Sequence, residues 1–195
     1  MPFEVGDTIF LGDSITFEGS WSELFPDVRT RNRGISGDTS AGVLERVEQI
    51  SATRPAKVFL MIGTNDLSLG TDEETIAKNV KDIVGNINNA SPETDIYVQS
   101  ILPREAKYKD EIESLNETLE ISLPDSAIWI DLYPHFLDDQ RTALRSELSN
   151  DGLHLKGEGY IIWQGLISEY IEKDRSSVMR LEEARINPVP EDEWT

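Results

Sequence analysis

Apolar positions along the chain follow two patterns, short continuous runs and longer stretches in which apolar residues recur every three or four positions. The short runs predict buried strands, at residues 8–11, 57–62, 95–101 and 127–131. Residues 28–32 are predicted to be a short second strand. The stretches with helical spacing predict helices, at residues 17–25, 40–50, 112–119 and 161–171, and from a capping box at 71–74 to residue 87. Strands that alternate with helices indicate a three-layer α/β/α fold with a mainly parallel sheet of about five strands.

The length of 195 residues fits a single domain, which we expect to span residues 1–184. The last segment, residues 185–195, holds two prolines and several acidic residues, and we expect a tail that is disordered or lies on the surface. The chain has no cysteine, which excludes a disulfide framework and thiolate chemistry.

The formal net charge of −19 changes the picture of possible partners. Such a surface repels polyanions, so we expect no nucleic-acid partner and no binding to an anionic membrane surface. The acidic bias is compatible with simple solubility, which we prefer, and with a high-salt habitat. No apolar run approaches the roughly 20 residues needed to span a bilayer, so we expect no membrane insertion. Residues 1–5 do not resemble a signal peptide, and a cytoplasmic location is expected.

Candidate chemistry begins at Ser14, directly after the first predicted strand, in Gly-Asp-Ser-Ile-Thr. In open α/β sheets ligands bind beyond the carboxyl ends of the strands. A serine hydroxyl needs a base to take its proton and a third group to orient that base. Asp151 and His154 stand three residues apart near the other end of the chain, close enough for one turn to join them. We therefore predict Ser14 as nucleophile, His154 as base and Asp151 as orienting carboxylate.

An acyl-transfer intermediate also needs hydrogen-bond donors aimed at its oxyanion. Gly37 follows the second predicted strand, and Asn65 follows the third in Gly-Thr-Asn-Asp. A glycine backbone N–H and an asparagine amide are suitable donors, and a helix that begins near Ser40 would place its positive end beside Gly37.

These four blocks resemble the SGNH hydrolases, also called the GDSL esterase/lipase family, over roughly residues 7–172. The resemblance implies a flavodoxin-like three-layer fold and a serine esterase. It implies Ser14, His154 and Asp151 as the triad and the Ser14 N–H, the Gly37 N–H and the Asn65 amide as oxyanion donors. The wider pattern looks most like the branches that include carbohydrate O-acetylesterases and acetylhydrolases.

Other side chains near the predicted site have two possible interpretations, a contact with substrate or a purely structural role. Phe17 and Trp21 are candidates for substrate contact or for core packing, and Trp129 shares that ambiguity. Arg104 is a candidate contact for an anionic substrate group, although a solvated loop is the preferred reading. His135 stands beside aromatic residues and has no partner with metal-ligand spacing, so we expect a packed loop residue, no metal site and no cofactor.

We therefore predict an esterase that hydrolyses short acyl esters, acetyl above all, of a small molecule or an O-acetylated carbohydrate. Two alternatives stay open at this point, namely a lysophospholipase or thioesterase for longer acyl chains and a non-catalytic ligand-binding protein on the same fold. The sequence does not give the oligomeric state.

Overall fold

A computed structural model describes residues 6–173 of the chain. Its sheet has five strands, all parallel, in the order β2-β1-β3-β4-β5. The strands are β1 (Thr8–Gly12), β2 (Thr30–Gly34), β3 (Lys57–Met61), β4 (Asp95–Gln99) and β5 (Ala127–Ile130). The helices are α1 (Ser14–Phe17), α2 (Trp21–Leu24), α3 (Ser40–Ser51), α4 (Thr64–Ser68), α5 (Glu73–Ala90), α6 (Lys109–Ser122) and α7 (Gly157–Glu172). Short 3₁₀ turns lie at Ala106–Tyr108, Tyr133–His135 and Ser146–Leu148. The predicted three-layer fold is confirmed.

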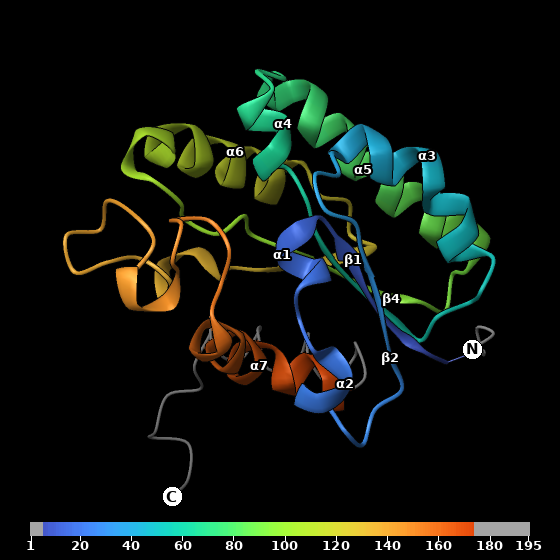
Figure 1. Ribbon diagram of the computed structural model, residues 1–195. Coiled ribbons are helices and arrows are strands. Elements are labelled where there is room, and N and C mark those ends of the chain that lie inside the picture. The colour runs from blue at the N-terminus through green and yellow to red at the C-terminus, as the bar shows by residue number, and fades with distance from the viewer. Residues whose placement is uncertain (1–5, 174–195) are drawn as a thin grey trace, which may run out of the picture.

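Helices cover both faces of the sheet, with α3, α5 and α6 on one side and α2 and α7 on the other (Figure 1). Alternation along β1 explains the two layers, because successive side chains point to opposite faces. Ile9 and Leu11 join an aliphatic core with α3 and α5. Phe10 faces the other way and stacks on Trp21 with ring centroids 3.8 Å apart. Two distinct cores therefore hold β1 in place.

The strand order reverses at β1, because β2 pairs with one edge of β1 and β3 pairs with the other. In a doubly wound sheet a ligand crevice forms at such a reversal. Gly12, at the end of β1, is paired with Gly34 of β2 and with Met61 of β3. The three strands thus end at the same level. The segments that follow them, which carry Ser14, Gly37 and Asn65, are brought to one edge of the sheet.

The segment predicted as one helix over residues 17–25 is two short helices, α1 and α2. The Nδ2 of Asn32 donates hydrogen bonds to the carbonyl oxygens of Thr16, Phe17 and Gly19. These bonds occupy carbonyls at the end of α1 that a continuous helix would need, so the chain turns before α2 begins at Trp21.

Several boundaries also differ from the prediction. Strand β2 starts and ends two residues later, because its register with β1 runs from Thr30 to Gly34. Helix α5 is capped by Asp72, whose carboxylate accepts from the N–H of Thr75 at 2.8 Å. Helix α7 starts at Gly157, four residues earlier than predicted, so its first turn includes Gly157 and Gly159.

Within residues 6–173, no helix is long and apolar enough to cross a membrane. The predicted tail at residues 185–195, and the predicted end of the domain at residue 184, lie outside the described residues.

Candidate active site

Ser14 is the first residue of α1, two residues beyond the end of β1. The carboxylate of Asp13 caps this helix by accepting from the N–H of Ile15 at 2.9 Å. The approach of the neighbouring strand requires glycine at position 12, since a Cβ there would lie 2.3 Å from the carbonyl oxygen of Met61. These local constraints hold Ser14, whose side chain is largely buried, at the carboxyl edge of the sheet.

Ser14, His154 and Asp151 form a continuous chain of hydrogen-bond contacts. The Nε2 atom of His154 lies 2.9 Å from the Oγ of Ser14, and its Nδ1 lies 2.7 Å from the Oδ2 of Asp151. In this geometry His154 can take the hydroxyl proton while the carboxylate fixes its tautomer. The structure thus brings together the three residues that the sequence analysis predicted as nucleophile, base and orienting carboxylate.

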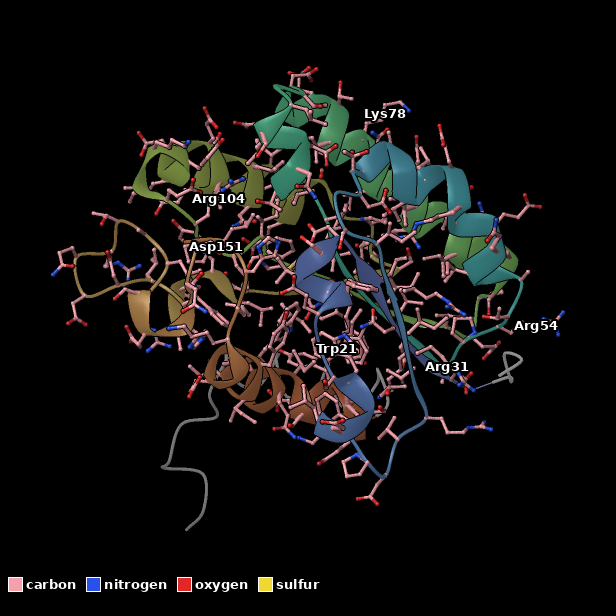
Figure 2. The ribbon with its side chains drawn as sticks, viewed as in Figure 1. Trp21, Arg31, Arg54, Lys78, Arg104 and Asp151 are labelled. Atoms are coloured by element: carbon pink, nitrogen blue, oxygen red, sulfur yellow. The ribbon has the colours of Figure 1, made fainter. Side chains whose placement is uncertain are left out.

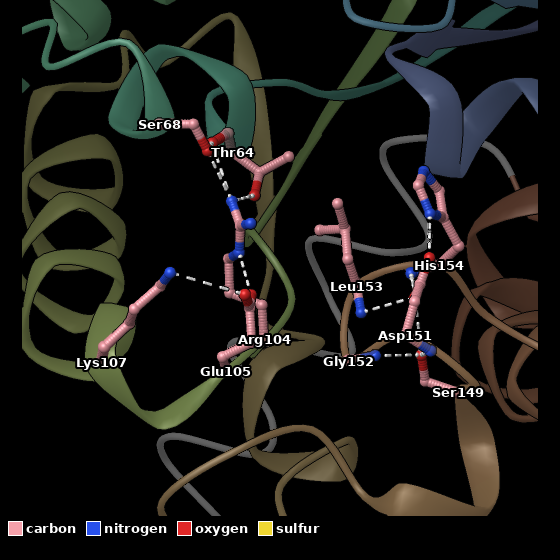
Figure 3. Close-up of polar contacts among 10 residues, drawn as sticks. All are labelled: Thr64, Ser68, Arg104, Glu105, Lys107, Ser149, Asp151, Gly152, Leu153 and His154. Atoms are coloured by element: carbon pink, nitrogen blue, oxygen red, sulfur yellow. Dashed lines mark hydrogen bonds and ion pairs between the residues drawn. The ribbon is translucent and has the colours of Figure 1, made fainter.

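Asp151 is oriented by bonds within its own loop. Its Oδ1 accepts from the N–H of Leu153 at 3.0 Å and from the N–H of His154 at 2.8 Å, and it is 3.1 Å from the Oγ of Ser149 (Figure 3). Gly152 makes the turn possible with φ +77°. The hydrogen bond from the His154 side chain, with those from the backbone, lowers the pKa of the Asp151 carboxyl below its usual range. Asp151 is therefore a carboxylate throughout the neutral pH range.

The three predicted oxyanion donors lie on the segments that follow β1, β2 and β3. Ser14 is the first residue of a helix, where the N–H has no intrahelical acceptor. Gly37 has φ +77°, and no acceptor within residues 6–173 pairs with its N–H. Asn65 donates one amide hydrogen to the carbonyl oxygen of Asp38 at 2.9 Å, which leaves the second for a ligand. Three N–H donors on adjacent segments suit an oxyanion.

Arg104 points away from His154 and toward α4 (Figure 3). Its Nη1 donates to the Oγ of Ser68 at 2.7 Å, and its Nε donates to Glu105 at 2.8 Å. The guanidinium also lies 3.9 Å from the ring centroid of Tyr108. Most of this side chain is thus committed to protein contacts that support α4, the helix that carries Asn65. A contact between Arg104 and substrate stays a prediction.

The aromatic candidates have different surroundings. Phe17 is 56% exposed at the end of α1, while Trp21 is 2% exposed. Trp21 belongs to the core, where its Nε1 donates to the carbonyl oxygen of Thr16 at 2.9 Å, so it offers no face to a sugar. Trp129 is partly buried against the aliphatic core. His135 is exposed, and the expectation that it is packed was wrong.

Sequence reasoning did not identify the partners of Asp13, Asp38 and Asp66, the acidic residues next to the oxyanion donors in the sequence. Burial raises the pKa of the Asp13 carboxyl to about 7. Asp66 accepts from both the N–H and the Oγ of Ser40, the latter at 2.6 Å. Asp38 pairs with Arg46 at 2.7 Å. No local sequence signal joins these partners. Across residues 6–173, no group of three or more histidine or acidic side chains is arranged to hold a metal ion.

A serine, a histidine and a carboxylate in this arrangement, beyond the strands of an α/β sheet, are typical of serine-dependent acyl hydrolases. Residues 10–162 match the model of the GDSL-like Lipase/Acylhydrolase family, and the chain belongs to that family. It is an ester-hydrolysing enzyme.

Relatives and solved structures agree with this assignment. The platelet-activating factor acetylhydrolase IB subunit alpha2 of Homo sapiens is 32% identical over 166 residues, which cover 79% of this chain and 71% of that protein. A GDSL-like lipase from Bacteroides thetaiotaomicron superposes with a TM-score of 0.78 and 26% identity, covering 88% of this chain and 92% of that one. An acetyl-xylooligosaccharide esterase from Geobacillus shares the fold, with a TM-score of 0.68 and 20% identity over 90% and 98% of the two chains.

Proposed function

We propose that this enzyme is a serine esterase for short acyl esters, acetyl esters above all, and that it acts through an acyl-enzyme on Ser14. The observation that carries the proposal is the unbroken contact chain from Asp151 through His154 to Ser14, with distances of 2.7 and 2.9 Å. A protein that only binds a ligand does not require this series of hydrogen-bond contacts.

In the first half of the reaction, the Oγ of Ser14 attacks the ester carbonyl carbon while the Nε2 of His154 takes the hydroxyl proton. The resulting imidazolium is stabilised by Asp151. Collapse of the tetrahedral intermediate breaks the bond to the alcohol oxygen, and His154 returns the proton to that oxygen. In the second half, His154 takes a proton from water, the hydroxide adds to the acyl carbon, and Ser14 leaves with the proton restored.

The negative charge of each tetrahedral intermediate develops on the former carbonyl oxygen. The N–H groups of Ser14 and Gly37 and the free amide hydrogen of Asn65 are the proposed donors to it. Loss of one such donor typically lowers kcat by about 10²–10³-fold. We expect Asn65→Ala to lower kcat by this factor while the fold is retained, and near-normal turnover would remove Asn65 from the mechanism.

The proposed substrate class is an acetyl ester of a small molecule or a carbohydrate. The relative from Homo sapiens, at 32% identity, is named an acetylhydrolase, which supports a small acyl group. The carbohydrate part of the proposal relies on the sequence pattern, since the acetyl-xylooligosaccharide esterase is only 20% identical. Trp21 is buried and is therefore excluded as a residue that stacks on a sugar ring.

The test is hydrolysis of p-nitrophenyl acetate, butyrate and octanoate by the wild type, by Ser14→Ala and by Ser22→Ala. Ser22 is an exposed serine of α2 and serves as the matched control, and circular dichroism checks the fold of all three proteins. We expect a preference for acetate that Ser14→Ala abolishes and Ser22→Ala retains.

A preference for octanoate would refute the short-acyl assignment in favour of a lysophospholipase or thioesterase. Equal rates for wild type and Ser14→Ala would refute the nucleophile. If the wild type hydrolyses no ester and Ser14 does not react with a serine-directed phosphonate, a non-catalytic ligand-binding protein replaces the proposal.

A further inference from the structure

The guanidinium of Arg46, in the second turn of α3, contacts three different segments beneath the proposed oxyanion donors. Its Nε and Nη2 both bind the Oδ2 of Asp38, at 2.9 and 2.7 Å. The same Nη2 donates to the carbonyl oxygen of Arg33 at 3.0 Å and to that of Gly12 at 3.3 Å. The side chain of Arg46 is 16% exposed, so these bonds are largely shielded from water.

These acceptors lie next to the groups that the mechanism uses. Gly12 is the last residue of β1 and precedes Ser14 by two residues, Arg33 is near the end of β2, and Asp38 directly follows Gly37. A single planar cation therefore sets the spacing between the segment that carries Ser14 and the turn that carries Gly37. A guanidinium suits this task because its donors have a fixed planar arrangement, whereas an ammonium is a point charge on a flexible stem.

The third donor depends on the same ion pair. The backbone carbonyl of Asp38 accepts one amide hydrogen of Asn65 at 2.9 Å. This bond fixes the rotation of the amide and so determines where its second hydrogen points. A shift of Asp38 would therefore move both the Gly37 N–H and the Asn65 amide.

Glycine at position 42 makes room for the Asp38 carboxylate. A Cβ on Gly42 would lie 2.1 Å from the Oδ1 of Asp38, a distance at which the carboxylate must move. The Oδ1 also accepts from the N–H of Thr39, the residue that caps α3, at 3.0 Å. Arg46 and Gly42 thus constrain the same carboxylate from two sides.

Charge gives the pair a second effect. An uncompensated carboxylate at position 38, next to Gly37, would oppose the negative charge of a tetrahedral intermediate. The guanidinium bound to it offsets that charge. Substitution of Arg46 is therefore expected to act on the transition state, in which the oxyanion forms, more than on ground-state binding.

We propose that Arg46 is a positioning residue for the oxyanion hole, acting through Asp38 on Gly37 and Asn65. The inference depends on the proposed esterase function and adds to it a residue that never touches substrate. It predicts that Arg46 and Asn65 are energetically coupled in catalysis.

The chain offers a matched control in Arg31, whose Nε donates to the carboxylate of Asp7 at 2.8 Å. That pair lies near the amino ends of the strands, and Figure 2 shows Arg31 far across the molecule from Asp151. Arg31→Gln removes an arginine–aspartate pair of similar length without touching the site. Any loss that reflects only a weakened fold should appear in both arginine variants.

The experiment measures kcat and KM for p-nitrophenyl acetate, together with thermal melting, in wild type, Arg46→Lys, Arg46→Gln and Arg31→Gln. We expect Arg46→Gln to lower kcat by about 10–100-fold with KM changed by less than about threefold. Arg46→Lys keeps the positive charge but lacks the planar arrangement of donors, so its kcat should lie between those of Arg46→Gln and the wild type. Arg31→Gln should keep the wild-type kcat.

The decisive comparison repeats Arg46→Gln in the Asn65→Ala background. If Arg46 acts through the donors, its substitution should lower kcat by a much smaller factor once Asn65 is gone. An equal factor in both backgrounds, or a folded Arg46→Gln enzyme with kcat within twofold of wild type, would overturn the inference. An inactive wild type would instead refute the esterase function itself.

Gly42→Ala provides a second route if the arginine variants fold poorly. It displaces the Asp38 carboxylate and leaves Arg46 in place. We expect a lower kcat at similar KM, and wild-type kcat in a folded Gly42→Ala enzyme would count against the role assigned to Asp38.

Discussion

The substitution Asp151→Asn tests the orientation of the base, because the loop around residue 151 dictates how the new amide must sit. The N–H groups of Leu153 and His154 both donate to the Oδ1 of Asp151, at 3.0 and 2.8 Å. An asparagine must keep its oxygen at that position, since the opposite rotamer would set its NH₂ against two donors. The NH₂ then occupies the place of Oδ2, 2.7 Å from the Nδ1 of His154.

An amide NH₂ at that place forces Nδ1 to accept, so the ring proton moves to Nε2 and faces Ser14. His154 can then no longer take the hydroxyl proton. The same exchange in another serine hydrolase lowers kcat on the order of 10⁴-fold, or about 5 kcal/mol of barrier, and we expect a similar loss here. The fold should be nearly unaffected, because the backbone bonds of the loop are kept.

The assay compares kcat for p-nitrophenyl acetate, with melting temperature, in wild type, Asp151→Asn and Asp138→Asn. Asp138 also accepts from a backbone N–H, that of Thr142 at 2.7 Å, but outside the triad, so its exchange controls for the loss of a loop carboxylate. A folded Asp151→Asn enzyme within tenfold of the wild-type kcat would refute the assigned tautomer and with it the orienting role of Asp151.

Three further substitutions test stability, each by thermal and urea unfolding. Burial raises the pKa of Asp13 to about 7, against about 3.9 in an unfolded chain, so wild-type stability should fall as the pH rises through this interval. Asp13→Asn should therefore gain about 2–3 kcal/mol on wild type between pH 5 and pH 8, and a constant difference would contradict the shift. Lys57 donates to the carbonyl oxygens of Tyr170, Ile171 and Lys173 at the end of α7, so Lys57→Met should cost about 2 kcal/mol. Gly37→Ala should cost about 1–2 kcal/mol through its positive φ alone, since no atom lies within 4 Å of the added Cβ. Unchanged stability would contradict either of these last two expectations.

Most of the sheet was predictable because β1, β3 and β4 are largely buried and appear in the sequence as short, mainly apolar runs. Boundaries were less predictable where a distant partner decides them. The end of β2 follows from its pairing with β1, and the break after α1 depends on Asn32, which binds carbonyls 13–16 residues earlier in the chain. Trp21 was a candidate for core packing and for sugar contact alike, and its burial and its stacking on Phe10 in the folded chain place it in the core.

The proposed site likewise contains residues that local sequence spacing reveals and residues that only the fold brings together. Asp151 and His154 are three residues apart, so a local turn suffices to join them and their spacing is visible in the sequence. Arg46 and its acceptors are 8–34 residues apart, and nothing in their spacing marks them as partners. A pattern of catalytic residue types therefore indicates the reacting groups, while the residues that set their geometry become visible only when the fold brings them together.

The contact between Ser14 and His154 spans 140 positions, and it depends on how α7 docks against α1. The hydroxyl of Tyr160, in the first turn of α7, donates to the carbonyl oxygen of Ile15 at 2.7 Å. Trp163 packs edge-on against Trp21 one turn later, with centroids 4.9 Å apart. Since His154 lies three residues before the start of α7, this aromatic core sets the distance between nucleophile and base. The buried tryptophan that cannot bind a sugar thus supports the proposed reaction by keeping the two ends of the chain in register.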